Sequence, residues 1–493
     1  MNCHIHNLSK KIILIFLMFL VYISSNSQSK EKSIVILVNF DIYNAINNEL
    51  NTFKADLELD KYNVILKNST YQTPEEIREY LQTIYNSTTP KLIGAILMGQ
   101  IPLAKQFFIV TYGNPDLSPT THNCFTTQFY SDLDGNFIKN DPAYPESYSE
   151  HTGDTIPEIW VSVLPYYKSI PNTISQIKQY LNKNHEYRNG NIDIQDGFIE
   201  VNEHYRADNE DDYNYYINLM KSGPYSWTPF TEWGNVGLYI YNSIGKLDIA
   251  YAYEEELRSN KYTFAALTAH GSYYTNGELS IPEIKNMEIK PVFVWLGGCN
   301  TGNLDYNENI ATEILYSSLN NVLVTKGGTS NVGGLGNNEN GFFGKNIATA
   351  MLEGKSIGEA LLYHNQIPLI YPWSTYFEMH NAPNIFFGDL SLTIKSIATM
   401  NEYKKENSFL LEGNIPNPFS QNTLINYRVH KNETVFFTVY NLMGRRVFYK
   451  EINNQESKNS LLINTSGWEN GVYFLTMETG NSVKKSIKLI KIE

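Results

Sequence analysis

Short apolar runs alternate with longer mixed segments over most of the chain. The runs at residues 33–39, 91–98 and 292–296 hold few polar residues, which is typical of strands that are buried on both faces of a sheet. The segments 42–59 and 170–188 instead have the spacing of amphipathic helices. This alternation predicts an α/β fold with a mostly parallel sheet that is covered by helices on both faces.

The pattern changes near residue 395. Residues 395–408 are polar and charged, and from residue 409 onward apolar residues recur at every second position between turn-forming segments. This period of two predicts short strands, and we therefore expect an all-β module of sandwich type.

The amino terminus has the layout of a secretory signal peptide. Lys10 and Lys11 precede twelve apolar residues at 12–23, and small residues follow up to Ser27. The run is well short of the ~20 residues that a membrane-spanning helix needs. We predict cleavage between Ser27 and Gln28 and a mature chain that is exported, with no transmembrane segment.

These patterns divide the chain into five predicted parts. They are a signal peptide at 1–27, an N-terminal α/β subdomain at 28–115, a second α/β subdomain at 116–394, a linker at 395–408 and a β-sandwich module at 409–493.

Composition narrows the classes of function. The 493 residues include 38 Lys and Arg against 51 Asp and Glu, which gives a net charge of −13. A nucleic-acid partner is not expected, because phosphate binding needs a broad basic surface. With only three cysteines, one of them in the signal peptide, stability must come from buried cores rather than from a disulfide framework.

Two predicted strands end in reactive residues. The run 264–269 leads directly into His270 and Gly271, and the run 292–296 leads into Gly297, Gly298 and Cys299. Ligands and catalytic loops gather at the carboxyl ends of parallel strands. If the two strands are neighbours, the imidazole and the thiol therefore lie side by side.

A cysteine and a histidine at adjacent strand ends are suited to acyl transfer. A thiolate attacks, imidazole moves protons, and backbone amides stabilise the oxyanion. Each residue alone is more often structural, since a cysteine after an apolar strand is usually an inert buried thiol. The combination, with glycines next to both residues, favours a functional site.

Two further candidates are weaker. Glu158 precedes a predicted strand and could orient His270 as a third catalytic group, although a Pro-Glu pair in this position is more often a solvated strand edge. Cys124 lies in the stretch 111–157, which is rich in Pro, Asn, Asp, Ser and Tyr and for which we predict a long loop. Cys124 therefore lacks the rigid placement that a nucleophile needs.

A short run of oxygen donors is the one candidate for a metal. Asp132, Asp134 and Asn136 surround Gly135, but their spacing does not match an EF-hand loop. A simple Asp-Gly turn is the alternative. We otherwise expect no cofactor.

The sequence around these residues resembles the gingipain-type cysteine peptidases of the caspase–gingipain group, over residues 33–393. The matching motifs are Leu97-Met-Gly99-Gln-Ile-Pro102, Tyr130-Ser-Asp132-Leu-Asp134-Gly135, Pro157-Glu158-Ile159 and Gly388-Asp389-Leu-Ser391-Leu392, together with His270-Gly271 and Gly298-Cys299. The resemblance implies a caspase-like α/β/α sandwich and endopeptidase activity. It also implies a nucleophile at Cys299, a general acid/base at His270 and oxyanion donors at the amides of Gly271 and Cys299, which makes 116–394 the catalytic subdomain.

The C-terminal module has a separate resemblance. Asn417-Pro-Phe419, Tyr440-Asn-Leu-Met-Gly444-Arg-Arg-Val447, Gly471-Val-Tyr473 and the basic ending Lys484–Lys491 are similar to the sorting domain of type IX secretion cargo. The resemblance implies the type IX machinery as a partner and a secreted or outer-membrane-surface location. A carbohydrate- or adhesion-binding β-sandwich is the alternative.

Two functions remain open at this stage. The first is a secreted or cell-surface cysteine endopeptidase that acts on protein or peptide substrates through a Cys-His dyad and an acyl-enzyme. The second is a catalytically silent surface scaffold or processing protein that retains the fold. The intact pair of His270 and Cys299 favours the first.

Overall fold

The structure is a computed structural model. It describes residues 30, 32–110, 119–154, 156–222, 227, 229–330, 338–365, 384–394, 410–429, 434–453, 458–479 and 484–492. The predicted signal peptide and the predicted linker lie outside these residues. Contacts within the chain define two units, residues 1–394 and 395–493, which are described separately.

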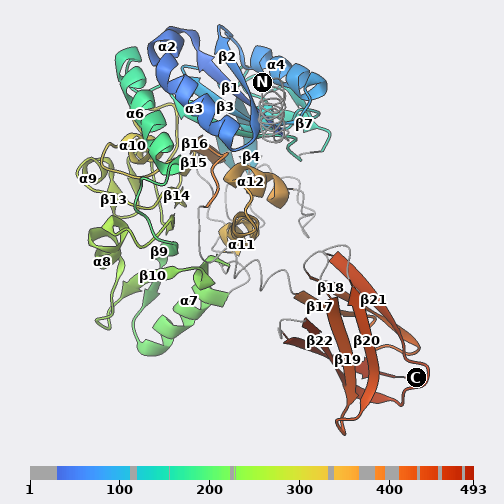
Figure 1. Ribbon diagram of the computed structural model, residues 1–493. Helices are drawn as coiled ribbons and strands as arrows, with labels where there is room; N and C mark the ends of the chain where they lie inside the picture. The colour runs from blue at the N-terminus through green and yellow to red at the C-terminus, as the bar shows by residue number, and fades with distance from the viewer. Residues whose placement is uncertain are drawn as a thin grey trace, which may run out of the picture. The chain divides into compact units, whose positions relative to one another are not determined.

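A ten-stranded sheet forms the centre of the first unit (Figure 1). Its strands, in spatial order, are β10 (Asn235–Asn242), β9 (Gly197–Ala207), β11 (Phe264–Thr268), β14 (Phe293–Leu296), β15 (Val324–Gly328), β16 (Asn384–Gly388), β8 (Trp160–Pro165), β3 (Leu92–Gly99), β1 (Lys32–Asn39) and β2 (Tyr62–Ser69). The sheet thus joins strands from both predicted α/β subdomains.

The sheet has two parallel halves. Strands β10, β9, β11, β14 and β15 run in one direction, and β16, β8, β3, β1 and β2 run in the other. Only the central pair β15–β16 is antiparallel. The predicted mostly parallel α/β architecture is therefore confirmed, and the carboxyl ends of β9, β11 and β14 lie together at one edge of the sheet.

Helices cover both faces of the sheet. They are α2 (Phe40–Tyr43), α3 (Asn47–Leu59), α4 (Pro74–Ser87), α5 (Gln128–Ser131), α6 (Ile170–Arg188), α7 (Glu210–Ser222), α8 (Ile249–Glu254), α9 (Ile281–Ile284), α10 (Ile310–Tyr316), α11 (Asn338–Leu352) and α12 (Ile357–Asn365). The crossovers through α3 and α4 run in opposite directions across the sheet, so right-handed connections place these two helices on opposite faces. α4 begins with a capping box of Thr73 and Glu76, and its Ile77 and Leu81 pack in one core with Leu37 of β1.

The stretch 111–157 is not one long loop, contrary to the sequence-based prediction. Its described part contains β5 (Thr120–Phe125), which pairs with β4 (Lys105–Val110), the helix α5, and the pair β6 (Asn136–Ile138) and β7 (Glu150–Thr152). β5 is polar in sequence yet buries alternate residues, His122 and Cys124. Two further short strands, β12 (Thr275–Asn276) and β13 (Leu279–Ser280), follow β11.

The second unit is a β-sandwich, as predicted. One sheet contains β17 (Leu410–Ile415), β18 (Asn422–Arg428) and β21 (Lys458–Asn464), and the other contains β20 (Arg446–Asn453), β19 (Thr434–Asn441), β22 (Gly471–Thr479) and β23 (Lys484–Lys491). Alternate residues of β19 are buried. Ile425 and Ile463 of the first sheet share a core with Phe437, Leu475 and Leu489 of the second.

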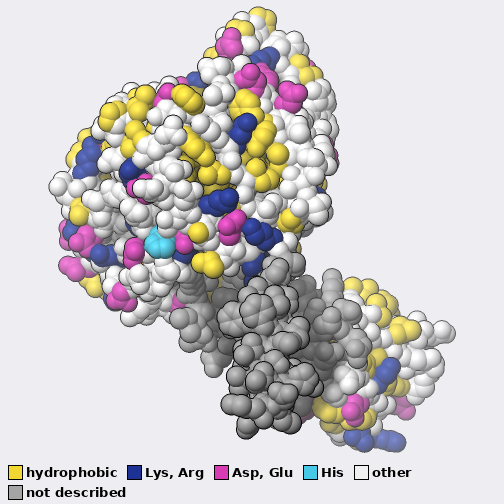
Figure 2. All heavy atoms as spheres, turned by 45° about the horizontal axis from the view of Figure 1, so that its top comes forward, with side chains coloured by type: hydrophobic (Ala, Val, Ile, Leu, Met, Phe, Trp, Pro, Cys, Tyr) yellow, Lys and Arg dark blue, Asp and Glu magenta, His cyan; other side chains and the backbone are white. Residues whose placement is uncertain are grey.

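Charged side chains of both signs occur on the surface. On the face drawn in Figure 2, Lys and Arg side chains are interspersed with Asp and Glu rather than gathered in one stripe. None of the described helices combines the length and the apolar character that crossing a membrane requires.

Candidate active site

His270 and Cys299 follow adjacent parallel strands. β11 pairs with β14 so that Leu267 lies beside Leu296, and the Gly297 amide donates to the Leu267 carbonyl at 2.8 Å. His270 is three residues beyond Leu267, and Cys299 is three residues beyond Leu296. The register of the two strands thus brings both loops to the same edge of the sheet, as the sequence predicted.

The two loops touch at glycines. A Cβ built on Gly271 would lie 2.8 Å from the Cα of Gly298 and 2.8 Å from a methyl carbon of Thr301. Real Cβ atoms do not approach a backbone atom this closely. The glycines next to His270 and Cys299 therefore permit the loops to pack backbone against backbone.

A buried amide side chain joins the same two loops. Asn276 is fully buried in the short hairpin that follows His270. Its Oδ1 accepts from the Gly298 amide at 3.0 Å, and its Nδ2 donates to the Leu267 carbonyl at 3.2 Å. Asn276 was not predicted from the sequence, because its only local signal is an Asn-Gly turn.

Cys299 lies on a sharp turn and is partly exposed. Asn300, the next residue, has a left-handed backbone with φ 55°, and its amide donates to the Ser330 carbonyl at 2.9 Å. Among the described residues, none accepts a hydrogen bond from the amide of Gly271 or of Cys299. Both amides are thus available to a ligand oxygen.

Cys124 has a different environment. Its side chain is buried, and burial raises the pKa of its thiol to about 12. The thiolate form that nucleophilic attack requires is therefore rare at neutral pH.

His270 is exposed, and a second histidine lies beside it. The ring of His204, on β9, meets the ring of His270 edge to face, with centroids 4.7 Å apart. Partial burial, and then the charge on His270, lower the pKa of His204. His204 is therefore mainly neutral at pH 7.

The structure does not bring Glu158 to His270. Glu158 precedes β8, the fourth strand from β11 in the sheet, and strand spacing makes this separation roughly 19 Å. The acid that contacts the loop of His270 is Glu203 on β9. Its carboxylate accepts from the Tyr253 hydroxyl at 2.7 Å and from the Glu278 amide at 3.1 Å, and the neighbouring Gly277 amide donates to the His270 carbonyl at 2.7 Å.

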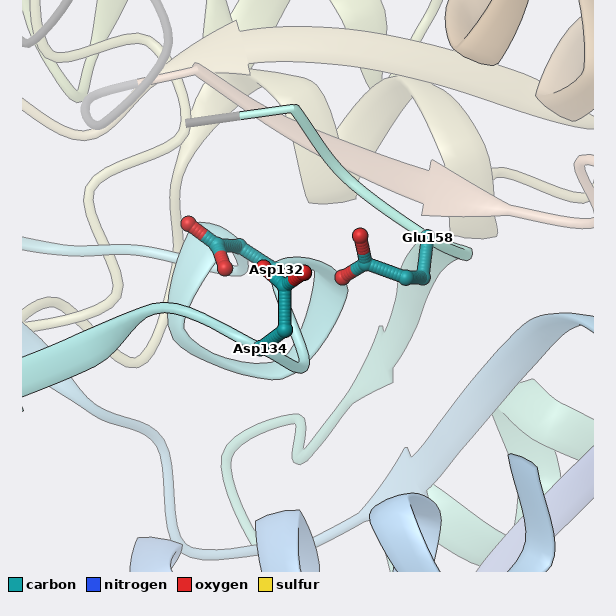
Figure 3. A group of neighbouring side chains, drawn as sticks. All are labelled: Asp132, Asp134 and Glu158. Carbon is teal, nitrogen blue, oxygen red and sulfur yellow. The ribbon is translucent and has the colours of Figure 1, made fainter. Parts of the chain in front are cut away.

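Glu158 instead belongs to an acidic cluster with Asp132 and Asp134 (Figure 3). One carboxylate oxygen from each lies within 4.8 Å of the others. Burial is the main cause that raises the pKa of Glu158, and the hydrogen bond from the Leu133 amide opposes it. The charges of Asp134 and Asp132 raise the pKa further. Asp132 already accepts from the Gly135 amide at 2.7 Å and from the His151 ring at 2.9 Å. Calcium binding here stays a prediction.

A hollow lies beside the loop that carries His270. It has a volume of about 530 Å³, and its lining residues are Tyr273, Tyr274, Ile281, Pro282, Lys285, Asn286 and Glu308. The ring of Tyr273 stacks on Tyr306, with centroids 3.7 Å apart. This wall is both aromatic and charged.

Comparisons with known proteins identify the family of the chain. The profile of peptidase family C25 matches residues 28–394, and the profile of a secretion system C-terminal sorting domain matches residues 415–492. No curated protein matches the chain.

One solved structure supports the fold, and a second match is weaker. This chain is similar to the crystal structure of the Arg-specific cysteine proteinase gingipain R (RGPB), with 12% identity and a TM-score of 0.50. The match covers 94% of this chain and 99% of the gingipain R chain. Dimeric latent PorU from Porphyromonas gingivalis matches 93% of this chain over 43% of its own length, with 9% identity and a TM-score of 0.28.

The match to family C25 covers most of the chain, and the fold is gingipain-like. The sorting domain indicates export through type IX secretion, to the cell surface or the medium. The chain therefore belongs to peptidase family C25, a cysteine peptidase family, and ends in a secretion sorting domain.

Proposed function

We propose that this protein is an endopeptidase that hydrolyses peptide bonds through a dyad of Cys299 and His270. The observation that carries the proposal is the β11–β14 register, which sets both residues three positions beyond a paired leucine. The contact between Gly271 and Gly298 supports it, because the loops touch next to the two reactive side chains.

The proposed reaction has two steps. The Cys299 sulfur attacks the scissile carbonyl carbon, while His270 takes the thiol proton and gives it to the departing amine. Water, deprotonated by His270, then attacks the thioester, and the sulfur leaves as the thiolate, which recovers its proton. In both steps the amides of Gly271 and Cys299 donate to the oxyanion.

Protein or peptide substrates would bind along the hollow beside Tyr273. Its aromatic rings offer apolar area, and Lys285 and Glu308 supply charges of both signs. Asn276 and Glu203 would act as positioning residues, because they hold the loops and contact no reacting atom.

Active-site labelling of the full chain tests the proposal. A peptide library is incubated with the protein, with and without a peptidyl acyloxymethyl ketone, and the labelled peptide is identified by mass spectrometry. We expect cleavage of some peptides, loss of cleavage on labelling, and the label on Cys299. Absence of cleavage across the library and of any label on Cys299 would favour the silent scaffold instead.

Gly271→Ala should damage the site without removing a reactive group. The new Cβ would lie 2.8 Å from the Cα of Gly298, so the two loops must separate, and small displacements of reacting groups can cost about 10²-fold in rate. We expect a loss of that order in kcat/KM. Gly467→Ala is the control, because no atom lies within 4 Å of its added Cβ. Equal activity of both variants would show that the loop contact is dispensable.

Removing the second unit should separate catalysis from export. The two units have separate contact networks, so we expect a chain ending at Ser408 to fold and cleave peptides yet accumulate in the periplasm. Residues 409–493, attached to an unrelated protein with a signal peptide, should direct that protein outward in a host with type IX machinery. Fractionation and immunoblotting measure both. A truncated chain that reaches the medium without lysis would contradict a sorting role.

A further inference from the structure

Lys326 is a buried charged residue that the proposed mechanism does not use. It lies in the middle of β15 and is 3% exposed. Its ammonium nitrogen is 3.2 Å from the Leu296 carbonyl oxygen and 5.3 Å from the centre of the Trp295 ring. Among the described residues, this carbonyl is its one hydrogen-bond acceptor. Burying a charge with so little compensation is costly, so the position calls for a reason.

The Leu296 carbonyl is where β14 turns into the loop of Cys299. The Gly297 amide bonds toward β11, so the Leu296 carbonyl in the same peptide plane points toward β15. Backbone pairing between β14 and β15 stops at Trp295 and Lys326. The side chain of Lys326 thus replaces the missing backbone donor at the last carbonyl of the strand.

The rest of this loop is also tied to β15. The Gly302 amide donates to the Gly328 carbonyl at 2.7 Å, and the Asn300 amide donates to the Ser330 carbonyl at 2.9 Å. Bonds from the loop to Gly328, the last residue of β15, and to Ser330 just beyond it therefore flank Cys299 on its carboxyl side, and the ammonium of Lys326 holds the chain on its amino side.

We propose that Lys326 is a positioning residue for the nucleophile, which fixes the turn at Leu296 and stabilises the negative charge of the Cys299 thiolate. The proposal rests on the role proposed above for Cys299. It adds a fixed cation at the Leu296 carbonyl, separate from the imidazole of His270.

The charges around Lys326 agree with this role. Burial lowers the pKa of Lys326 to about 8, and the charge on Cys299 opposes that effect. The ammonium of Lys326 therefore predominates at pH 7. Glu200 lies in the same cross-strand row, separated from Lys326 by Ala266 and Trp295, and burial raises its pKa to about 7.

The pH dependence of Cys299 alkylation tests the proposal without any need for peptidase activity. The full chain and its Lys326→Met variant are treated with iodoacetamide from pH 5 to 10, and Cys299 modification is measured by mass spectrometry. Methionine keeps most of the length and removes the charge. We expect the midpoint of the rate profile to rise by about one pH unit, the order for one unit charge in a protein interior.

Lys183→Met is the matched control. Burial lowers the pKa of Lys183 to about 7, and its ammonium donates to the Leu315 carbonyl at 2.9 Å, but that carbonyl belongs to α10. The midpoint of Cys299 alkylation in Lys183→Met should match that of the wild type. An unshifted midpoint in folded Lys326→Met, or the same shift in Lys183→Met, would overturn the proposal. If Lys326→Met shows the expected shift of the alkylation midpoint but the wild-type protein cleaves no peptide, the result would contradict only the proposed function.

If the Lys326→Met variant fails to fold, a second measurement tests the proposal without it. In His270→Ala, which retains Lys326, the rates of alkylation by anionic iodoacetate and neutral iodoacetamide are compared. Below pH 8 their ratio should exceed that of free cysteine, and it should fall as Lys326 loses its proton. A ratio equal to that of free cysteine throughout would refute the presence of an effective cation.

Discussion

Cys299→Ala should abolish peptide hydrolysis. The substitution removes the only atom that can form the acyl-enzyme, and loss of a catalytic nucleophile commonly lowers kcat by roughly 10⁴–10⁶-fold. KM should change little, because the partly exposed thiol contributes little to ground-state binding. Initial rates on a cleaved library peptide, with circular dichroism to verify folding, measure the effect.

Cys124→Ala is the control for this experiment. The Cys124 thiol is buried, with a pKa raised to about 12, so it can neither attack nor be labelled readily. We expect kcat/KM within about threefold of the wild type and a small loss of stability from the vacated volume. Full activity in Cys299→Ala with loss in Cys124→Ala would move the nucleophile to β5.

The central strands and the pair of reactive residues could be predicted because both depend on local sequence. Buried parallel strands are continuous apolar runs, and His270 and Cys299 directly follow two of them. Once these strands are neighbours, their register leaves little freedom for the loops.

Other parts of the fold depend on pairings that no local pattern reveals. β5 has polar residues at most positions, and only the hairpin with β4 decides which of them become buried. The edge strand β10 was not predicted for a similar reason, because its first residues are exposed and only some later ones are buried.

The prediction for Glu158 shows the limit of reasoning from order along the chain. Glu158 precedes a strand, as expected, but β16 comes from the end of the unit and inserts between β15 and β8. β14, β15 and the inserted β16 together separate Glu158 from β11. Glu203 reaches the His270 loop because β9 extends as far as Ala207.

His270→Ala should remove nearly all turnover while leaving the fold intact. General acid–base help is commonly worth about 10²–10⁴-fold, and removal of a group that acts together with a nucleophile can cost more. His270 is exposed, so its loss leaves no buried cavity, and the melting temperature should barely change. Stopped assays on the same peptide over pH 5–9 measure the loss.

His204→Ala is the matched variant, because the two rings lie 4.7 Å apart. Burial and the charge on His270 lower the pKa of His204, so a neutral ring is removed from beside an imidazole that must gain and lose a proton. We expect a loss of less than about tenfold in kcat. If His204→Ala were as inactive as His270→Ala, and His270→Ala kept appreciable turnover, proton transfer would belong to the residue on β9.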